Sequence, residues 1–217
     1  MAAMTERAQT LREEIANALS HGLGFLLAVA SLPVLVVFAS RHGGAGSVVG
    51  ASVFSATMML LYLVSAVYHA LPHGRAKRLF QRFDHAAIFL FIAGSYTPFV
   101  LGPLRGAWGW SLFGVVWGIA AVGVVAKVFD RLAHPFWSTG LYVGMGWLAL
   151  VAVVPLFERV APGGLVLLFA GGAAYTVGAV FFLLDHRVRY AHFVWHLFVM
   201  AGSACHFFAA LWHAQSA

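Results

Sequence analysis

Seven apolar runs, each long enough to cross a lipid bilayer as a helix, fill almost the whole of this sequence. A membrane-spanning helix needs about 20 predominantly apolar residues. The runs lie at residues 22–40, 47–70, 84–102, 107–128, 135–157, 163–184 and 191–212. Only 9% of the residues are charged, against about 25% in an average soluble domain. The sequence therefore predicts an all-α, polytopic membrane protein with seven transmembrane helices and no separate soluble domain.

The lysines and arginines between these runs predict the orientation in the membrane. One side of the predicted bundle carries ten of them: Arg7, Arg12, Arg75, Lys77, Arg78, Arg82, Lys127, Arg131, Arg187 and Arg189. The other side carries three: Arg41, Arg105 and Arg159. Because positive charge stays with the cytoplasm, we expect a cytoplasmic N-terminus and a C-terminus outside. The expected location is the cell membrane, which the chain crosses several times.

The first part of the chain, residues 1–21, is expected to be a cytoplasmic amphipathic segment ahead of a seven-helix transmembrane domain at residues 22–217. Residues 5–20 place four apolar residues on one helical face: Leu11, Ile15, Ala18 and Leu19. Such a helix lies along the membrane surface and runs into the first span. A polar stripe follows at helical spacing: Glu14, Asn17 and His21. This stripe is either a solvated face or part of a site at the mouth of the bundle.

Three groups of polar residues lie inside the predicted spans. They are Ser65 with His69 near the end of the second span, Asp84 with His85 at the start of the third, and His192 with His196 at the start of the seventh. An ionisable side chain inside a span is costly, and by default it faces the bundle interior and marks a functional site. The second span ends at the cytoplasmic side, where the third and seventh begin. All three groups therefore fall in one layer.

The spacing of these residues predicts a metal site. His192 and His196 are four residues apart, so their imidazoles emerge on one helix face about 6 Å apart. His69 would supply a third nitrogen, and three histidines with water in a fourth position are typical of catalytic zinc. Asp84 can hold that water or act as a general base. Ser65, one turn from His69, can bind a substrate oxygen or orient a ligand. Three imidazoles also suit other divalent metals.

Plainer interpretations exist for single residues in this layer. Asp84 can be a helix N-cap, and His69 can be an interfacial side chain that reaches water. The convergence of three separate groups at one depth favours the metal site over both. His206 shares a helix face with His192 but lies about 21 Å further along the axis, so it cannot join the same metal. Two more histidines are candidates to support the ligands: His21 and His85.

The same residues resemble those of the hemolysin III proteins, bacterial members of the progestin and adipoQ receptor family. The matching stretches are residues 14–22, 65–69, 83–88, 93–98 and 192–196. The resemblance implies seven helices with the N-terminus inside, and a place beside the alkaline ceramidases in a wider group of metal-dependent membrane hydrolases. It also implies that zinc binds to His69, His192 and His196, with Ser65 and Asp84 as the associated serine and acid.

Three functions stay open at this point. The first is a zinc-dependent hydrolase that acts on a lipid amide or ester at the cytoplasmic side of the bilayer. The second is a receptor-like or membrane-homeostasis protein in which zinc only clamps the helices together. The third is a lytic, hemolysin-like membrane protein. A nucleic-acid partner is not expected despite the net charge of +6, because the basic residues form no long block.

Overall fold

The computed structural model describes residue 7 and residues 9–215, and within that part of the chain every regular element is a helix. The elements are α1 (Leu11–His42), α2 (Ala45–Ala70), α3 (Arg75–Leu101), α4 (Ala107–Val128), α5 (Pro135–Gly146), η1 (Trp147–Ala152), α6 (Val153–Arg159), α7 (Pro162–Leu184) and α8 (Ala191–His213). The described residues include seven helical stretches long and apolar enough to span a membrane, with α5, η1 and α6 forming one of them. The predicted seven-span membrane protein is confirmed.

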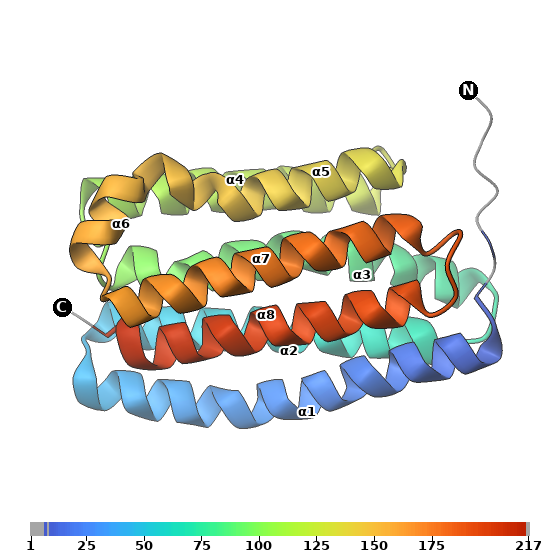
Figure 1. Ribbon diagram of the computed structural model, residues 1–217, viewed down its shortest axis with the longest axis horizontal. Helices are drawn as coiled ribbons and strands as arrows, with labels where there is room; N and C mark the ends of the chain where they lie inside the picture. The colour runs from blue at the N-terminus through green and yellow to red at the C-terminus, as the bar shows by residue number, and fades with distance from the viewer. Residues whose placement is uncertain (1–6, 8, 216–217) are drawn as a thin grey trace.

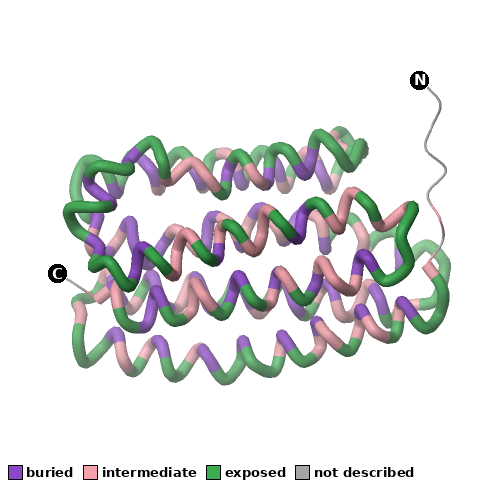
Figure 2. Tube along the Cα trace, in the orientation of Figure 1, coloured by how far each residue is buried: buried purple, intermediate pink, exposed green. Residues whose placement is uncertain are grey.

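The spans lie roughly side by side, and their ends form the two ends of the bundle (Figure 1). Helix α1 packs against α2 and α8, α2 against α3, α3 against α4, and α7 against α8 and α5. Buried residues line the inner sides of the helices, whereas the outer sides are exposed (Figure 2). Many exposed side chains are large and apolar, for example Val122 on α4 and Leu26 on α1. Lipid is the expected solvent for such a surface.

Helix α1 begins at Leu11, because Thr10 and Glu13 form a capping box in front of it. The backbone N–H of Thr10 donates to the Glu13 carboxylate over 2.9 Å, and the Glu13 N–H donates to the Thr10 hydroxyl. Such a box satisfies N–H groups that a helix start leaves without partners. The helix was expected to begin earlier, at residue 5. Arg7 and Gln9 precede it in non-helical conformation, and residues 5, 6 and 8 lie outside the described residues.

The apolar face and the polar face of α1 lie in different environments. The apolar face expected to lie on the membrane is exposed at Leu11, Ile15 and Leu19. The opposite, polar face is turned into the bundle, where Asn17 and His21 are buried. The polar stripe is therefore an interior feature and not a solvated face.

Helix α3 begins at Arg75, well before the apolar run that starts at residue 84. Asp84 consequently lies in the body of a helix, and its interpretation as an N-cap is wrong. The basic residues assigned to the connection before the third span lie on α3 itself, and Lys77 is buried there. A helix that extends beyond the lipid explains this, because its charged first turns carry no apolar signal.

The fifth span is broken in its middle by the short 3-10 helix η1. Pro155 explains the break, because proline has no N–H to donate and its ring clashes with the carbonyl four residues earlier, here Val151. Tyr96 of α3 compensates for it. The Tyr96 hydroxyl donates to the carbonyl of Gly146 over 2.7 Å and accepts from the N–H of Ala149 over 2.9 Å. A side chain of a neighbouring span thus replaces backbone partners that water cannot supply in lipid.

The orientation of the bundle is a prediction that reporter fusions can test. An odd number of spans places the two chain ends on opposite sides, and the excess of Lys and Arg assigns the N-terminal end to the cytoplasm. A reporter active only outside the cytoplasm should be active when fused after Ala217 and silent when fused at Gly74. The reverse pattern of activity would place the polar layer on the outer side of the membrane.

Candidate metal centre

Three buried histidines from two helices form one cluster at the end of the bundle where α1 begins. His69 comes from the last turn of α2, and His192 and His196 come from the start of α8. The centroids of the three rings form a nearly equilateral triangle with sides of 4.8, 4.9 and 5.0 Å. One ligand atom from each histidine lies within 4.8 Å of the others. Three side chains that the sequence placed at one depth therefore meet, and they can hold a metal ion.

Each ring of the cluster has its Nδ1 atom held by a second side chain. Nδ1 of His69 lies 2.7 Å from the Glu14 carboxylate, and Nδ1 of His192 lies 2.9 Å from the Asp185 carboxylate. Nδ1 of His196 lies 3.0 Å from the Ser20 hydroxyl. An ionised carboxylate only accepts hydrogen bonds, so Nδ1–H of His69 and His192 is the donor.

This arrangement leaves the Nε2 lone pairs for a metal. Nε2 of His69 is buried and has no hydrogen-bond partner among the residues described here. A buried nitrogen without a partner is costly, and a metal ion would relieve that cost. Metal-binding histidines in proteins commonly donate their second N–H to a carboxylate. Two features of the cluster therefore fit a metal site: the free Nε2 atom of His69, and the carboxylates at the Nδ1 atoms of His69 and His192.

Glu14 joins three helices behind His69. Besides His69, its carboxylate contacts the ammonium group of Lys77 on α3 over 3.0 Å. Lys77 also donates to the backbone carbonyls of Tyr68 and Leu71 at the end of α2. Because the ammonium group has several partners, the buried Glu14–Lys77 ion pair retains hydrogen bonds in place of water. The last turn of α2, and His69 with it, is thus positioned from α1 and α3.

The turn between α7 and α8 is held by a second acidic residue of α1. The Glu13 carboxylate accepts from the backbone N–H of Tyr190 over 2.9 Å and pairs with Arg7 over 2.6 Å. Tyr190 has a φ of 59°, a conformation that non-glycine residues seldom adopt. Arg7 also donates to the backbone carbonyl of Asp185. This network fixes the turn that carries Asp185 and precedes His192.

Ser65 and Asp84, the serine and the acid of the expected site, lie beside the histidines. Both are buried, and both line the same cavity as His192 and His196. The Ser65 hydroxyl lies 2.7 Å from Nδ1 of His21, whose ring is stacked on His196 with 3.4 Å between centroids. A residue with a hydroxyl group and a residue with a carboxyl group therefore line the cavity next to the histidine cluster.

The two histidines expected to support the ligands differ in their positions. His21 belongs to the cluster through its stacking on His196 and its contact with Ser65. His85 lines the cavity and packs edge-on against Phe182, with 6.1 Å between ring centroids. His206 lies at a distant part of the same cavity wall, as its spacing from His192 predicted.

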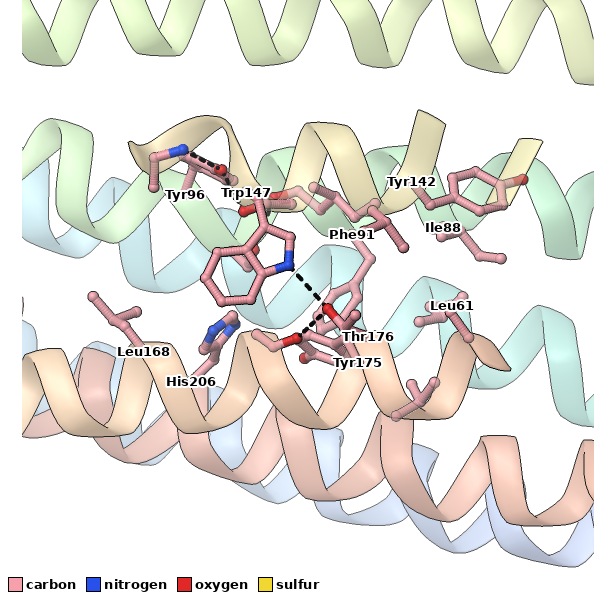
Figure 3. Close-up of a pocket in the computed structure, with 18 of the residues that line it drawn as sticks. Leu61, Ile88, Phe91, Tyr96, Tyr142, Trp147, Leu168, Tyr175, Thr176 and His206 are labelled. Atoms are coloured by element: carbon pink, nitrogen blue, oxygen red, sulfur yellow. Dashed lines mark hydrogen bonds between the residues drawn. The ribbon is translucent and has the colours of Figure 1, made fainter. Parts of the chain in front are cut away.

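The cluster opens into a largely apolar cavity of about 160 Å³ in the interior of the bundle. Its walls come mainly from α3, α5, α7 and α8. Figure 3 shows part of this wall, with Leu61 and Ile88 toward one side and Leu168 and His206 toward the other. A cavity of this size can hold several waters or part of an apolar chain. The histidine cluster thus lies at one end of an internal apolar space.

Three supporting residues were not found from the sequence: Ser20, Lys77 and Asp185. Asp185 lies seven residues before His192 across a turn, so no helical spacing links the two residues. Lys77 was counted only as an orientation charge. Ser20 precedes His21 in a polar stretch, and only the side-by-side packing of α1 and α8 brings it to His196.

Comparison with known proteins agrees with this architecture. The chain is 45% identical to Hemolysin-3 of Bacillus cereus, over 97% of this chain and 95% of that protein. It is 42% identical to the Hemolysin-3 homolog of Bacillus subtilis, over 94% and 95% of the two chains. It is 28% identical to the human monocyte to macrophage differentiation factor, over 92% and 84%. No solved structure matches the chain significantly. The family model described as haemolysin-III related matches residues 9–207, and the chain belongs to that family.

Proposed function

We propose that this protein is a zinc-dependent hydrolase that cleaves an amide or ester bond of a membrane lipid at the cytoplasmic side of the bilayer. The observation that carries the proposal is that two of the three clustered histidines, His192 and His196, line one cavity with Ser65 and Asp84. A structural zinc site usually has four protein ligands, whereas a catalytic site has three and keeps one position open. Within the described part of the chain, the group of side chains placed to hold one ion consists of three residues: His69, His192 and His196.

The residues around the cluster have distinct roles in this proposal. A bound zinc supplies Lewis acidity, which polarises a carbonyl group and makes water acidic enough to react near neutral pH. Asp84 takes the proton of the attacking water and later passes it to the leaving group. The Ser65 hydroxyl positions the oxygen of the scissile group beside Asp84. The apolar wall beyond them holds the hydrocarbon chain, so the bond to be cleaved stays at the polar end of the cavity.

A structural role for the metal is the second candidate. The ligands and their partners come from α1, α2, the α7–α8 turn and α8, so a bound metal would tie four parts of the bundle together. Such a clamp suits a receptor-like or membrane-homeostasis protein, and it needs neither the cavity nor a buried Asp84. The cavity favours the enzyme over the clamp.

A lipid turnover screen tests the proposal. Purified, zinc-loaded protein is incubated with a membrane lipid extract, and the products are followed by mass spectrometry. We expect one lipid class to decrease while a free fatty acid appears, and we expect no such change with metal-stripped protein. Full zinc occupancy with no lipid consumed would support the clamp and contradict the hydrolase.

A further inference from the structure

His206 on α8 belongs to the cavity but not to the metal cluster. It lies ten residues after His196, which places it about 15 Å further along the helix axis. Its ring packs edge-on against Tyr175, with 5.3 Å between centroids, and Figure 3 shows His206 between Leu168 and Tyr175. Gly171 of α7 makes room for the ring, because a Cβ there would come within 2.8 Å of Nε2. The fold has thus accommodated an imidazole in a largely apolar wall.

The hydrogen bonds of His206 leave one nitrogen as a free acceptor. Nε2 of the ring faces α7 at Gly171, and the ring lies beside the backbone carbonyl of Leu168 on the same helix. Nδ1 is buried and has no hydrogen-bond partner within the described residues, so we assign the ring hydrogen to Nε2, the nitrogen on the side of α7. In that tautomer Nδ1 carries a lone pair. Burying an acceptor without a donor costs free energy, because the hydrogen bond that it would form with water is lost.

Tyr175 next to His206 also offers an acceptor. The Ser203 hydroxyl donates its single hydrogen to the carbonyl of Val199 over 2.9 Å. In the 3.2 Å contact between Tyr175 and Ser203, the tyrosine is therefore the donor. Its own oxygen keeps lone pairs that no described hydrogen bond uses.

The other polar groups of this wall use their hydrogens within the protein. Trp147 donates to the Thr176 hydroxyl over 2.9 Å, and Thr176 donates to the carbonyl of Gly172 over 2.7 Å. His206 and Tyr175, which both line the cavity, thus keep acceptors without donors, while the hydrogens of the neighbouring polar groups are occupied. A ligand group that fits this wall must bring a hydrogen to donate.

We propose that His206 and Tyr175 form a second binding subsite, which takes a hydroxyl group borne on the hydrocarbon chain of a lipid whose polar end lies at the histidine cluster. This inference rests on the proposed lipid hydrolase and names the class of its substrate as lipids with a hydroxylated chain. The hydroxyl lies about 15 Å from the cluster, the axial distance from His196 to His206. A chain without a hydroxyl group leaves Nδ1 without a donor. A ketone at the same carbon only accepts hydrogen bonds, so it cannot pair with the lone pair of Nδ1.

Competition binding with fatty acids tests the subsite. Stearate, hydroxystearate isomers with the hydroxyl near the head or in the middle of the chain, and the mid-chain ketostearate are compared on zinc-loaded protein. We expect the mid-chain hydroxystearate to bind about tenfold more tightly than stearate, the effect of one hydrogen bond that satisfies a buried acceptor. The ketostearate and the head-proximal isomer should show no such gain.

Two variants attribute the preference to His206. His206→Phe keeps a planar ring and removes the acceptor, so the two chains should bind with nearly equal affinity. His213→Phe is the matched control, because His213 is the last residue of α8, packs against Gly163 and Gly164 and does not line the cavity, and it should keep the preference. Persistence of the preference in His206→Phe would overturn the proposal.

The native protein alone can also decide the question if His206→Phe does not fold. Equal binding of hydroxylated, keto and plain chains means that water satisfies Nδ1, and it overturns the subsite while leaving the hydrolase intact. If the hydroxyl and the ketone raise the affinity equally, His206 and Tyr175 do not act as acceptors, and the proposed subsite is overturned. If no fatty acid binds, the cavity does not take a hydrocarbon chain, and the proposed function is contradicted as well.

Discussion

Replacing Asp84 with asparagine should lower lipid hydrolysis by roughly 10²–10⁴-fold, the usual contribution of a positioned general base. Asp84 is buried in the cavity wall, and its carboxyl group faces the same space as Ser65 and His192. Asparagine keeps the shape and much of the hydrogen bonding but cannot accept the proton. Zinc content and thermal stability should therefore change little. Metal analysis, a melting curve and lipid turnover, measured on the same preparation, check all three expectations.

Asp185→Asn is the matched control for this substitution. It changes the same atoms at a carboxylate that holds Nδ1 of His192 and lies outside the cavity lining. We expect it to weaken zinc binding by about 10–100-fold, with turnover recovered when zinc is added in excess. Loss of zinc from Asp84→Asn would make Asp84 a ligand, and unchanged turnover in that variant would end its role as a base.

The spans could be predicted from the sequence because lipid demands long apolar stretches, and all seven are present. Their ends could not be predicted as well. Helix α3 extends back to Arg75 because charged side chains are free to continue a helix once it leaves the hydrocarbon. In the fifth span, Pro155 gave warning of an irregularity, but the identity of the compensating side chain, Tyr96, depends on which helix packs beside it.

The ligands of the candidate site could be predicted because two simple rules bring them together. Helical spacing pairs His192 with His196, and alternation of span direction brings His69 to their depth. The supporting residues obey neither rule. Asp185 reaches His192 across a turn, and Lys77 reaches Glu14 from a different helix.

The polar stripe of α1 illustrates why the environment of a face is hard to assign in a membrane protein. In a soluble helix a polar face meets water and an apolar face meets the core. In α1 the apolar residues Ile15 and Leu19 are exposed, and Asn17 and His21 are buried. The sequence shows one apolar and one polar face, but the face that meets the bundle could be decided only from the packing of α1 against α2 and α8.

Replacing His69 with alanine should abolish stoichiometric zinc binding and lower the melting temperature. The substitution removes one of three ligands. Loss of a residue that only supports a ligand lowers metal affinity by about 10–100-fold, so we expect loss of the ligand itself to lower zinc affinity by more than about 100-fold. It also leaves Glu14 with Lys77 as its remaining side-chain partner inside the bundle, and breaking a buried charged contact is destabilising. The melting temperature should fall further in zinc-loaded protein than in metal-stripped protein, because the native protein gains stability from the metal and the variant does not.

His206→Ala separates this effect from a general loss of packing. His206 is a half-buried histidine that lines the cavity of the same bundle, but its distance from the cluster prevents it from binding the same metal. The variant should keep about one zinc per chain and should keep the difference in melting temperature between loaded and stripped protein. Equal loss of zinc in the His69 and His206 variants would show that both histidines act through folding alone, and the metal centre would then have to be abandoned.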